Sequence, residues 1–173
     1  MADETIFPRG EVEAAFAHYR AIVEGAHGDE AKDYSAYSGI FTEPLEYVEH
    51  CMGNPDGRPG SPLLATDRKG IDDWMAYMMT RDLPPMTFPL EWTMIDGNRV
   101  AFKALNQLPT PPDGSGPYEI ASMTVMVYAG DGKFSSKEDV YNAKLWDHIL
   151  NAWMAAMGRS DLVADLGYGR VWA

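Results

Sequence analysis

Three segments in the first half of the chain have the residue spacing of amphipathic helices. Between residues 10 and 26, apolar side chains recur every three or four positions and form one stripe: Val12, Ala15, Phe16, Tyr19, Ile22 and Val23. Gly25 and Gly28 are predicted to end this helix. Asp29 can cap a shorter second helix that reaches Ile40. Thr66 or Asp67 then opens a third helix that runs to about Arg81.

A strand is predicted between the second and third helices, within the stretch FTEPLEYVEHCMG at residues 41–53. In residues 45–50 the alternation of a strand puts Leu45, Tyr47 and Glu49 on one face and Glu46, Val48 and His50 on the other. The next segment, GNPDGRPGSPLLA at residues 53–65, is rich in Gly and Pro. Its length predicts a loop that forms a lid or a pocket wall.

From residue 90 the pattern changes to a period of two. Residues 92–94 and 100–108 predict a hairpin around the turn at 96–98, and strands 118–128 and 133–141 predict a second hairpin around 130–132. A last helix is predicted over 143–157. The chain of 173 residues is therefore expected to be one α+β domain, with three N-terminal helices packed on a curved, mostly antiparallel sheet and a C-terminal helical extension over about 143–173.

Composition narrows the classes of partner. The formal net charge of −12 argues against binding to nucleic acid or to anionic membranes, which require basic surfaces. No apolar run approaches the roughly 20 residues that span a bilayer, and the start, MADETIFPRG, lacks the apolar segment of a secretory signal. The single Cys51 allows no internal disulfide. These features predict a cytoplasmic protein.

Apolar residues indicate both a pocket and an oligomer. The chain holds 11 Met, 5 Trp, 9 Tyr and 6 Phe, which pack well in a core and also suit an adaptable pocket for a hydrophobic small molecule. In strand 118–128 both faces are apolar, so Met123, Val125 and Val127 would lie exposed on the outer face of the sheet in a monomer. We therefore expect a homodimer or homotrimer packed through the sheet.

Three stretches of the sequence carry a family resemblance. They are FTEPLEYVEHCMG (41–53), which reads as a first strand, the helical GIDDWMAYM (70–78), and VYAGDGKFSSKEDVYN (127–142), which reads as a last hairpin. Together they resemble the nuclear-transport-factor-2-like superfamily, in its SnoaL-like, ketosteroid-isomerase-like and scytalone-dehydratase-like branch, over roughly residues 10–145. The resemblance implies a cone-shaped α+β barrel around a deep apolar pocket. Catalytic members of such families use no cofactor and include isomerases, cyclases, dehydratases, epoxide hydrolases and aldehyde-releasing lyases, whereas other members only bind.

Three residues are candidate acids or bases. Glu49 stands where the resemblance places the carboxylate base of the isomerases, and burial among apolar side chains would raise its pKa toward neutrality. His50 competes with Glu49 for this role, because strand alternation points the two to opposite faces. Asp139 matches the Asp that acts on water in the epoxide-hydrolase-like members. The arginine that often accompanies it is replaced here by Lys137 and Glu138, which argues against epoxide hydrolysis.

Further side chains are candidates for holding a substrate, with core packing or capping as the alternative role of each. Tyr34 and Tyr47 could donate hydrogen bonds to a developing oxyanion. The other candidates are Tyr37, Tyr118, Tyr141, Asn106, Ser122, Asn142 and His27 as polar contacts, and Trp74, Met78, Trp92 and Phe102 as pocket wall. The four His residues lack metal-binding spacing, and no GxSxG motif occurs, so neither a metal site nor a serine nucleophile is predicted.

The residues and the resemblance together predict a cofactor-independent lyase or dehydratase. It would act by acid/base proton transfer on a hydrophobic, aromatic, oxygenated small molecule, and its reactions would include aldehyde-releasing cleavage of a lignin-derived diaryl diol. The alternatives are a ketosteroid-isomerase-like isomerase or polyketide cyclase, and a small-molecule-binding module without catalysis. The orientation of Glu49, His50 and Asp139 discriminates between them, because an enzyme of this kind is excluded if all three face solvent.

Overall fold

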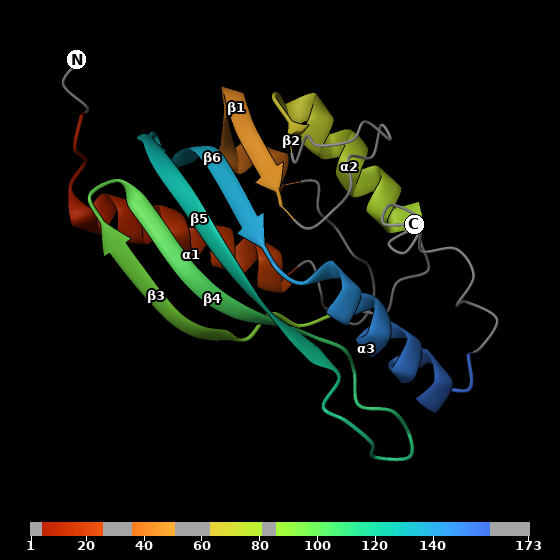
Figure 1. Cartoon of the computed structure of the whole chain (residues 1–173). Coiled ribbons are helices and arrows are strands. Elements are labelled where there is room, and N and C mark those ends of the chain that lie inside the picture. Colours follow the sequence, from red (N-terminus) through yellow and green to blue (C-terminus); the bar gives the residue numbers. More distant parts are fainter. Residues whose placement is uncertain (1–4, 26–35, 51–62, 81–85, 160–173) are drawn as a thin grey trace.

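The structure is a computed structural model, which describes residues 5–25, 36–50, 63–80 and 86–159 (Figure 1). The elements in chain order are α1 (Arg9–Gly25), the 3-10 turn η1 (Ser38–Ile40), β1 (Phe41–Glu49), β2 (Leu63–Ala65), α2 (Arg68–Thr80), β3 (Leu90–Asp96), β4 (Arg99–Gln107), β5 (Glu119–Gly130), β6 (Lys133–Val140) and α3 (Ala143–Ala156). None of the described helices is long and apolar enough to cross a membrane.

The strands form one curved sheet in the order β2-β1-β6-β5-β4-β3. Only β1 and β6 run parallel; every other neighbouring pair in this sheet is antiparallel. In Figure 1, α1 crosses one face of the sheet, α2 lies beside β1 and β2, and α3 lies beside the far end of β5. The predicted α+β architecture, with helices on a curved and mostly antiparallel sheet, is confirmed.

The main hydrophobic cluster lies between α1, α2 and the inner face of the sheet. The predicted stripe of α1 supplies Val12, Phe16 and Tyr19, and the sheet supplies buried residues such as Phe102 and Met126. A second cluster joins α3 to the far ends of β4 and β5 through Trp146, Leu150 and Trp153 from the helix and Leu108 and Ile120 from the sheet region. The C-terminal helix is therefore integrated into the fold through its own core.

The alternation predicted for the first strand is confirmed. Leu45, Tyr47 and Glu49 are buried in β1, whereas Glu46 is exposed. The predicted loop at 53–65 is wrong at its end, because Leu63–Ala65 forms β2 and pairs antiparallel with β1. A three-residue strand is too short for its own alternation to show in the sequence. Most of the predicted second helix lies outside the described residues, and its described end is a turn that leads into η1.

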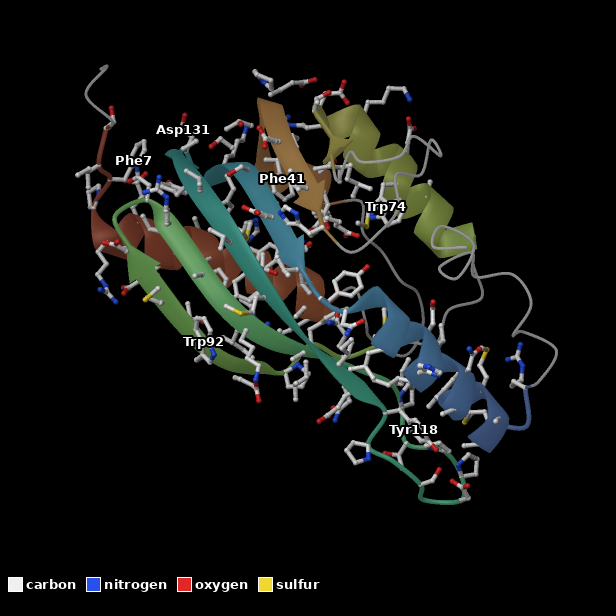
Figure 2. All side chains as sticks on the ribbon, viewed as in Figure 1. Phe7, Phe41, Trp74, Trp92, Tyr118 and Asp131 are labelled. Carbon is white, nitrogen blue, oxygen red and sulfur yellow. The ribbon has the colours of Figure 1, made fainter. Side chains whose placement is uncertain are left out.

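One predicted wall residue lies on the outer face of the sheet. Trp92 pairs with Lys103 and is 40% exposed, while its neighbour Thr93 pairs with the buried Phe102 (Figure 2). Because β3 is an edge strand with almost all of its residues exposed, its sequence gives no clear inner face. The other two described wall candidates, Trp74 and Phe102, are buried in the main cluster as expected.

Candidate functional site

The pairing of β1 with β6 brings charged residues together inside the sheet. Tyr47 is the register partner of Lys137, and Glu49 is the partner of Asp139. On the other side of β6, Asp139 pairs with Thr124 of β5. Strand alternation points all five side chains to the inner face. Glu49, Thr124, Lys137 and Asp139 are each 8% exposed or less, which is unusual for three charged side chains in a hydrophobic core.

The Tyr47 hydroxyl is the centre of this buried polar cluster. Its oxygen lies 2.9 Å from Glu49 Oε1, 2.9 Å from Asp139 Oδ2 and 3.0 Å from Lys137 Nζ. Lys137 Nζ also forms an ion pair with Asp139 Oδ2. Thr124 donates from Oγ1 to Asp139 Oδ1 at 2.5 Å. The second oxygen of Glu49, Oε2, is buried and has no hydrogen-bond partner among the described residues.

Counting donors and acceptors places the mobile proton on Glu49. A tyrosine hydroxyl has one hydrogen, so it can donate to only one of its two carboxylate neighbours. Asp139 already accepts from Lys137 on one oxygen and from Thr124 on the other, which suits an ionised carboxylate. Glu49 forms no ion pair among the described residues and is supported only by hydroxyl groups, those of Tyr47 and Tyr141. A protonated Glu49 can therefore donate to Tyr47 while Tyr47 donates to Asp139. When Glu49 ionises, the Tyr47 hydrogen can turn toward it instead.

Electrostatics favour the same assignment. Burial, and then the negative charge of Asp139, raise the pKa of Glu49 from 4.5 to about 7, against the opposing effects of the Lys137 charge and of hydrogen bonds from Tyr47 and Tyr141. At neutral pH Glu49 is therefore present in both protonation states in comparable amounts. A carboxyl group poised in this way can both accept and return a proton during a reaction.

The remaining groups of the cluster keep their protons. Burial raises the pKa of the phenol Tyr47 well above its ordinary value, with the charges of Asp139 and Glu49 acting in the same direction. For Lys137, burial alone would lower the pKa, but the charge of Asp139 and the nearby phenols and Glu49 outweigh it and raise the pKa. Tyr47 therefore remains a hydrogen-bond donor, and Lys137 remains a cation paired with Asp139.

Two further tyrosines extend the cluster toward α1. Burial raises the pKa values of Tyr37 and Tyr19. A hydrogen bond between Tyr37 and Lys137 opposes this rise for Tyr37, and a hydrogen bond between Tyr19 and Tyr37 opposes it for Tyr19. Their rings pack with centroids 6.2 Å apart. The predicted contact residue Tyr37 thus reaches the cluster through Lys137.

The described candidate acids and bases divide into buried and exposed groups. Glu49 and Asp139 are in the cluster, whereas His50 points to the other side of the sheet, where its side chain is 41% exposed and pairs with Glu138. Strand alternation correctly separated Glu49 from His50. Tyr141, predicted as a contact residue, lies close enough to Glu49 to lower its pKa.

Several predicted contact residues have other partners. Asn142 caps α3 by accepting a hydrogen bond from Leu145 N at 3.1 Å. Asn106 donates to Ile120 O at 3.3 Å, and Ser122 donates to Ala104 O at 3.5 Å, so both bind backbone of the neighbouring strand. Tyr118 packs against the second hydrophobic cluster, at the far end of β5 (Figure 2). His27, Tyr34 and the side chain of Met78 lie outside the described residues.

Sequence reasoning missed Lys137, Thr124 and Tyr19 as parts of this site. The signal for Lys137 was present, because it lies two positions from Asp139 on one strand and therefore on the same face. Thr124 was likewise a polar residue on the apolar inner face shared with Met126 and Tyr128. Within the described residues, no group of three or more His, Cys, Asp or Glu side chains is arranged to hold a metal ion.

Comparison with known proteins shows the fold. No protein family defined by a sequence profile matches the chain, and no curated protein does. Among solved structures, TerC co-crystallised with polyporic acid has a TM-score of 0.60 at 16% identity, covering 82% of this chain and 98% of TerC. An NTF2-like protein from Anabaena variabilis has a TM-score of 0.59 at 9% identity, covering 80% of this chain and 94% of that protein.

A third structure has a ketosteroid-isomerase-like fold and comes from Catenulispora acidiphila, in complex with trimethylamine. Its TM-score is 0.51 at 17% identity, and the match covers 86% of this chain and 92% of that protein. At identities this low, the matches show a shared architecture and say nothing about the ligands of this chain. The sheet, the helices that cover it and these matches show that the chain has the nuclear-transport-factor-2-like fold.

Proposed function

We propose that the protein is a cofactor-independent lyase of the dehydratase type, which acts by acid/base proton transfer on a hydrophobic, aromatic, oxygenated small molecule. The observation that supports this most is the Tyr47 hydroxyl placed between two buried carboxyl groups, only one of which forms an ion pair with Lys137. Such an arrangement is costly in a hydrophobic core. An acid/base function would explain this cost, because the cluster leaves Glu49 able to exchange a proton near neutral pH.

In a dehydration, one carboxyl group can serve both proton transfers. Ionised Glu49 removes a proton from the carbon next to a substrate carbonyl, and the phenol of Tyr47 donates a hydrogen bond to the enolate oxygen that forms. The bond from the neighbouring carbon to its hydroxyl group then breaks as the double bond forms. Glu49 returns its proton to the departing hydroxide, so the products are an alkene and water and Glu49 is ionised again.

The same groups can cleave an aryl-substituted 1,3-diol with release of an aldehyde. Ionised Glu49 removes the proton of the terminal hydroxyl, and the bond between the terminal carbon and its neighbour breaks. Its electron pair forms the new carbon–carbon double bond and expels the second hydroxyl, which leaves as water with the proton from Glu49. The products are an aldehyde, an alkene and water. This reaction is the one expected from the sequence for lignin-derived diaryl diols. Glu49 is ionised at its end, as it was at its start.

Substitution of Glu49 tests the proposal. A panel of aromatic diols, β-hydroxy carbonyl compounds, enones and epoxides is incubated with the wild-type protein, and products are identified by mass spectrometry. We expect turnover of a diol or hydroxy carbonyl compound and a loss of about 100-fold or more in kcat with Glu49→Gln. Glu138→Gln is the matched control, because it is the same change at a half-exposed residue on the neighbouring strand and should leave kcat unchanged.

The panel also separates the alternatives. Turnover of an enone to its isomer, with loss of activity in Glu49→Gln, would indicate an isomerase built on the same base. Turnover that survives Glu49→Gln and fails in His50→Ala would refute the role of the buried cluster. Binding of panel compounds without turnover of any of them would favour the small-molecule-binding module.

A further inference from the structure

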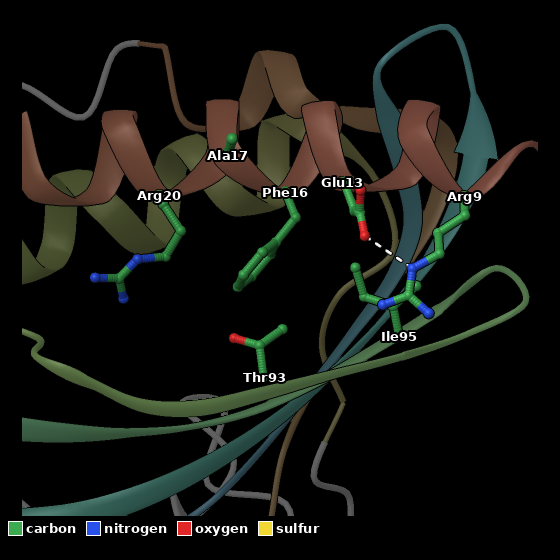
Figure 3. A pocket seen from close by; sticks show the side chains of 7 residues that line it. All are labelled: Arg9, Glu13, Phe16, Ala17, Arg20, Thr93 and Ile95. Atoms are coloured by element: carbon green, nitrogen blue, oxygen red, sulfur yellow. Dashed lines mark hydrogen bonds and ion pairs between the residues drawn. The ribbon is translucent and has the colours of Figure 1, made fainter.

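The structure contains an open groove beside α1. It lies between α1 and β3, has a volume of about 440 Å³, and is lined by Arg9, Glu13, Phe16, Ala17, Arg20, Thr93 and Ile95 (Figure 3). This volume is in the range of pockets that hold small molecules. Arg9 and Arg20 mark its two ends and stand about 16 Å apart along the helix, enough for a molecule of one or two rings.

The rim of this groove is close to electrically neutral. Arg9 pairs with Glu13 through Nε and Oε1 at 2.8 Å, and Arg20 pairs with Glu24. Arg20 also donates from Nη1 to Phe88 O at 3.1 Å, and this hydrogen bond connects α1 to the chain just before β3. Neutral rim pairs do not exclude an uncharged substrate. They also do not attract an anionic molecule, and the cluster itself already contains two carboxyl groups and one ammonium group.

Phe16 is the floor of the groove and the first ring of a path inward. Its ring projects from α1 toward Thr93 in Figure 3, yet the residue is only 7% exposed. It packs against Tyr19 at a centroid distance of 6.0 Å, and Tyr19 packs against Tyr37 at 6.2 Å. Tyr37 interacts with Lys137 of the cluster. Three aromatic side chains in series, Phe16, Tyr19 and Tyr37, therefore connect the groove with Lys137 of the cluster.

The position of β3 makes this side of the fold the easier one to open. Within the part of the chain that the structure describes, β3 is an edge strand whose one neighbour in the sheet is β4, and most of its residues are exposed. The opposite edge of the sheet, at β1 and β2, packs against α2. A small outward movement of β3, or a rotation of the Phe16 ring, would widen the groove without breaking the ladder between β1 and β6 that builds the cluster.

We infer that the groove between α1 and β3 is the entrance through which an uncharged aromatic substrate reaches the buried cluster, and that Phe16 is its gate. This inference rests on the proposed function for its substrate class. In this proposal Phe16 controls the entry of the substrate and does not touch the reacting atoms.

A pair of matched alanine substitutions tests the entrance. Ala17 and Ala14 are both exposed on α1, but only Ala17 lines the groove. The probe is 4-fluorobenzyl alcohol, an uncharged one-ring alcohol, and its rate of entry is measured by fluorine NMR exchange. We expect Ala17→Trp to slow entry by about tenfold or more, while Ala14→Trp leaves it within about twofold of wild type. Phe16→Leu, which keeps an apolar side chain, should speed entry.

The same measurements distinguish failure of the entrance from failure of the proposed function. Equal entry rates in wild type, Ala17→Trp and Ala14→Trp would overturn the entrance, even if turnover still depended on Glu49. A probe that does not bind, or whose affinity is unchanged in Glu49→Gln, would overturn it too. If Ala17→Trp slows entry but the wild-type protein turns over no compound of the panel, the proposed entrance stands and the proposed catalysis is refuted.

Discussion

The buried carboxyl group of Glu49 should make the protein less stable as pH rises. Its pKa is about 7 in the folded protein, compared with 4.5 for an ordinary glutamate. Between these values the folded state binds more protons than the unfolded state, so the free energy of unfolding falls as pH rises through this window. The contribution is present below about pH 4.5 and is lost as pH approaches and passes about 7.

The size of the effect follows from the two pKa values. One pKa unit corresponds to about 1.4 kcal/mol, and integration between about pH 5 and about pH 8 gives a loss of about 2–3 kcal/mol from this one group. Glu49→Gln removes this loss, because a neutral amide keeps the shape of the protonated carboxyl group and can donate to Tyr47 as that group does. The free energy of unfolding of the variant should therefore fall by about 2–3 kcal/mol less than that of wild type over the same pH interval.

Urea denaturation followed by tryptophan fluorescence at the two pH values measures this difference. Other titrating groups act in both proteins and cancel in the comparison. Glu138→Gln, at a residue with a half-exposed side chain, should show the wild-type dependence on pH. If Glu49→Gln instead shows the same pH dependence as wild type, the carboxyl group of Glu49 titrates alike in the folded and unfolded chains, and its pKa is not raised by folding.

Three other predictions concern the partners of Glu49 and the outer face of the sheet. Lys137→Met should lower the free energy of unfolding by about 3–5 kcal/mol in urea, because it leaves Asp139 buried without its cation, and adding Asp139→Leu should restore part of the loss. If the single variant were as stable as wild type, Asp139 would not depend on Lys137. Tyr47→Phe removes a hydrogen bond that lowers the pKa of Glu49, so any residual kcat/KM should rise with pH at a higher pH than in wild type; an unmoved profile would show that Tyr47 does not support the ionised base. Val125 lies on the outer face with Met123, which is 47% exposed, so Val125→Glu should convert a wild-type homodimer or homotrimer into monomers in sedimentation velocity, and a monomeric wild type would contradict the proposed assembly.

Local patterns in the sequence were sufficient to predict the longer described helices and strands and one half of the candidate site. The helical spacing of α1 and the alternation of β1 placed Tyr47 and Glu49 on the buried face, because each pattern depends only on neighbouring residues. The resemblance to a known superfamily added the expectation of a cone-shaped α+β barrel. A short strand such as β2 has too few residues to show a period, and the edge strand β3 has no clearly apolar face, so neither could be oriented from its own sequence.

The other half of the site depends on a pairing between distant segments. The spacing of Lys137 and Asp139 puts both side chains on one face of β6, but their partners Tyr47 and Glu49 are known only once β6 is placed beside β1. Thr124 likewise gains a role only when β5 is paired with β6. A buried charge is favourable only with its partners, so its burial cannot be predicted before the partners are known.

The most direct test of the account is a titration of the Glu49 carboxyl group in the folded protein. Carbon-13 NMR of protein labelled at the glutamate side-chain carboxyl carbons follows each group with pH, and Glu49→Gln assigns the signal by its disappearance. We expect one carboxyl signal that titrates near pH 7 and is absent in Glu49→Gln. If every glutamate carboxyl signal titrated near the ordinary value of 4.5, the central claim of a poised acid/base group at Glu49 would be contradicted.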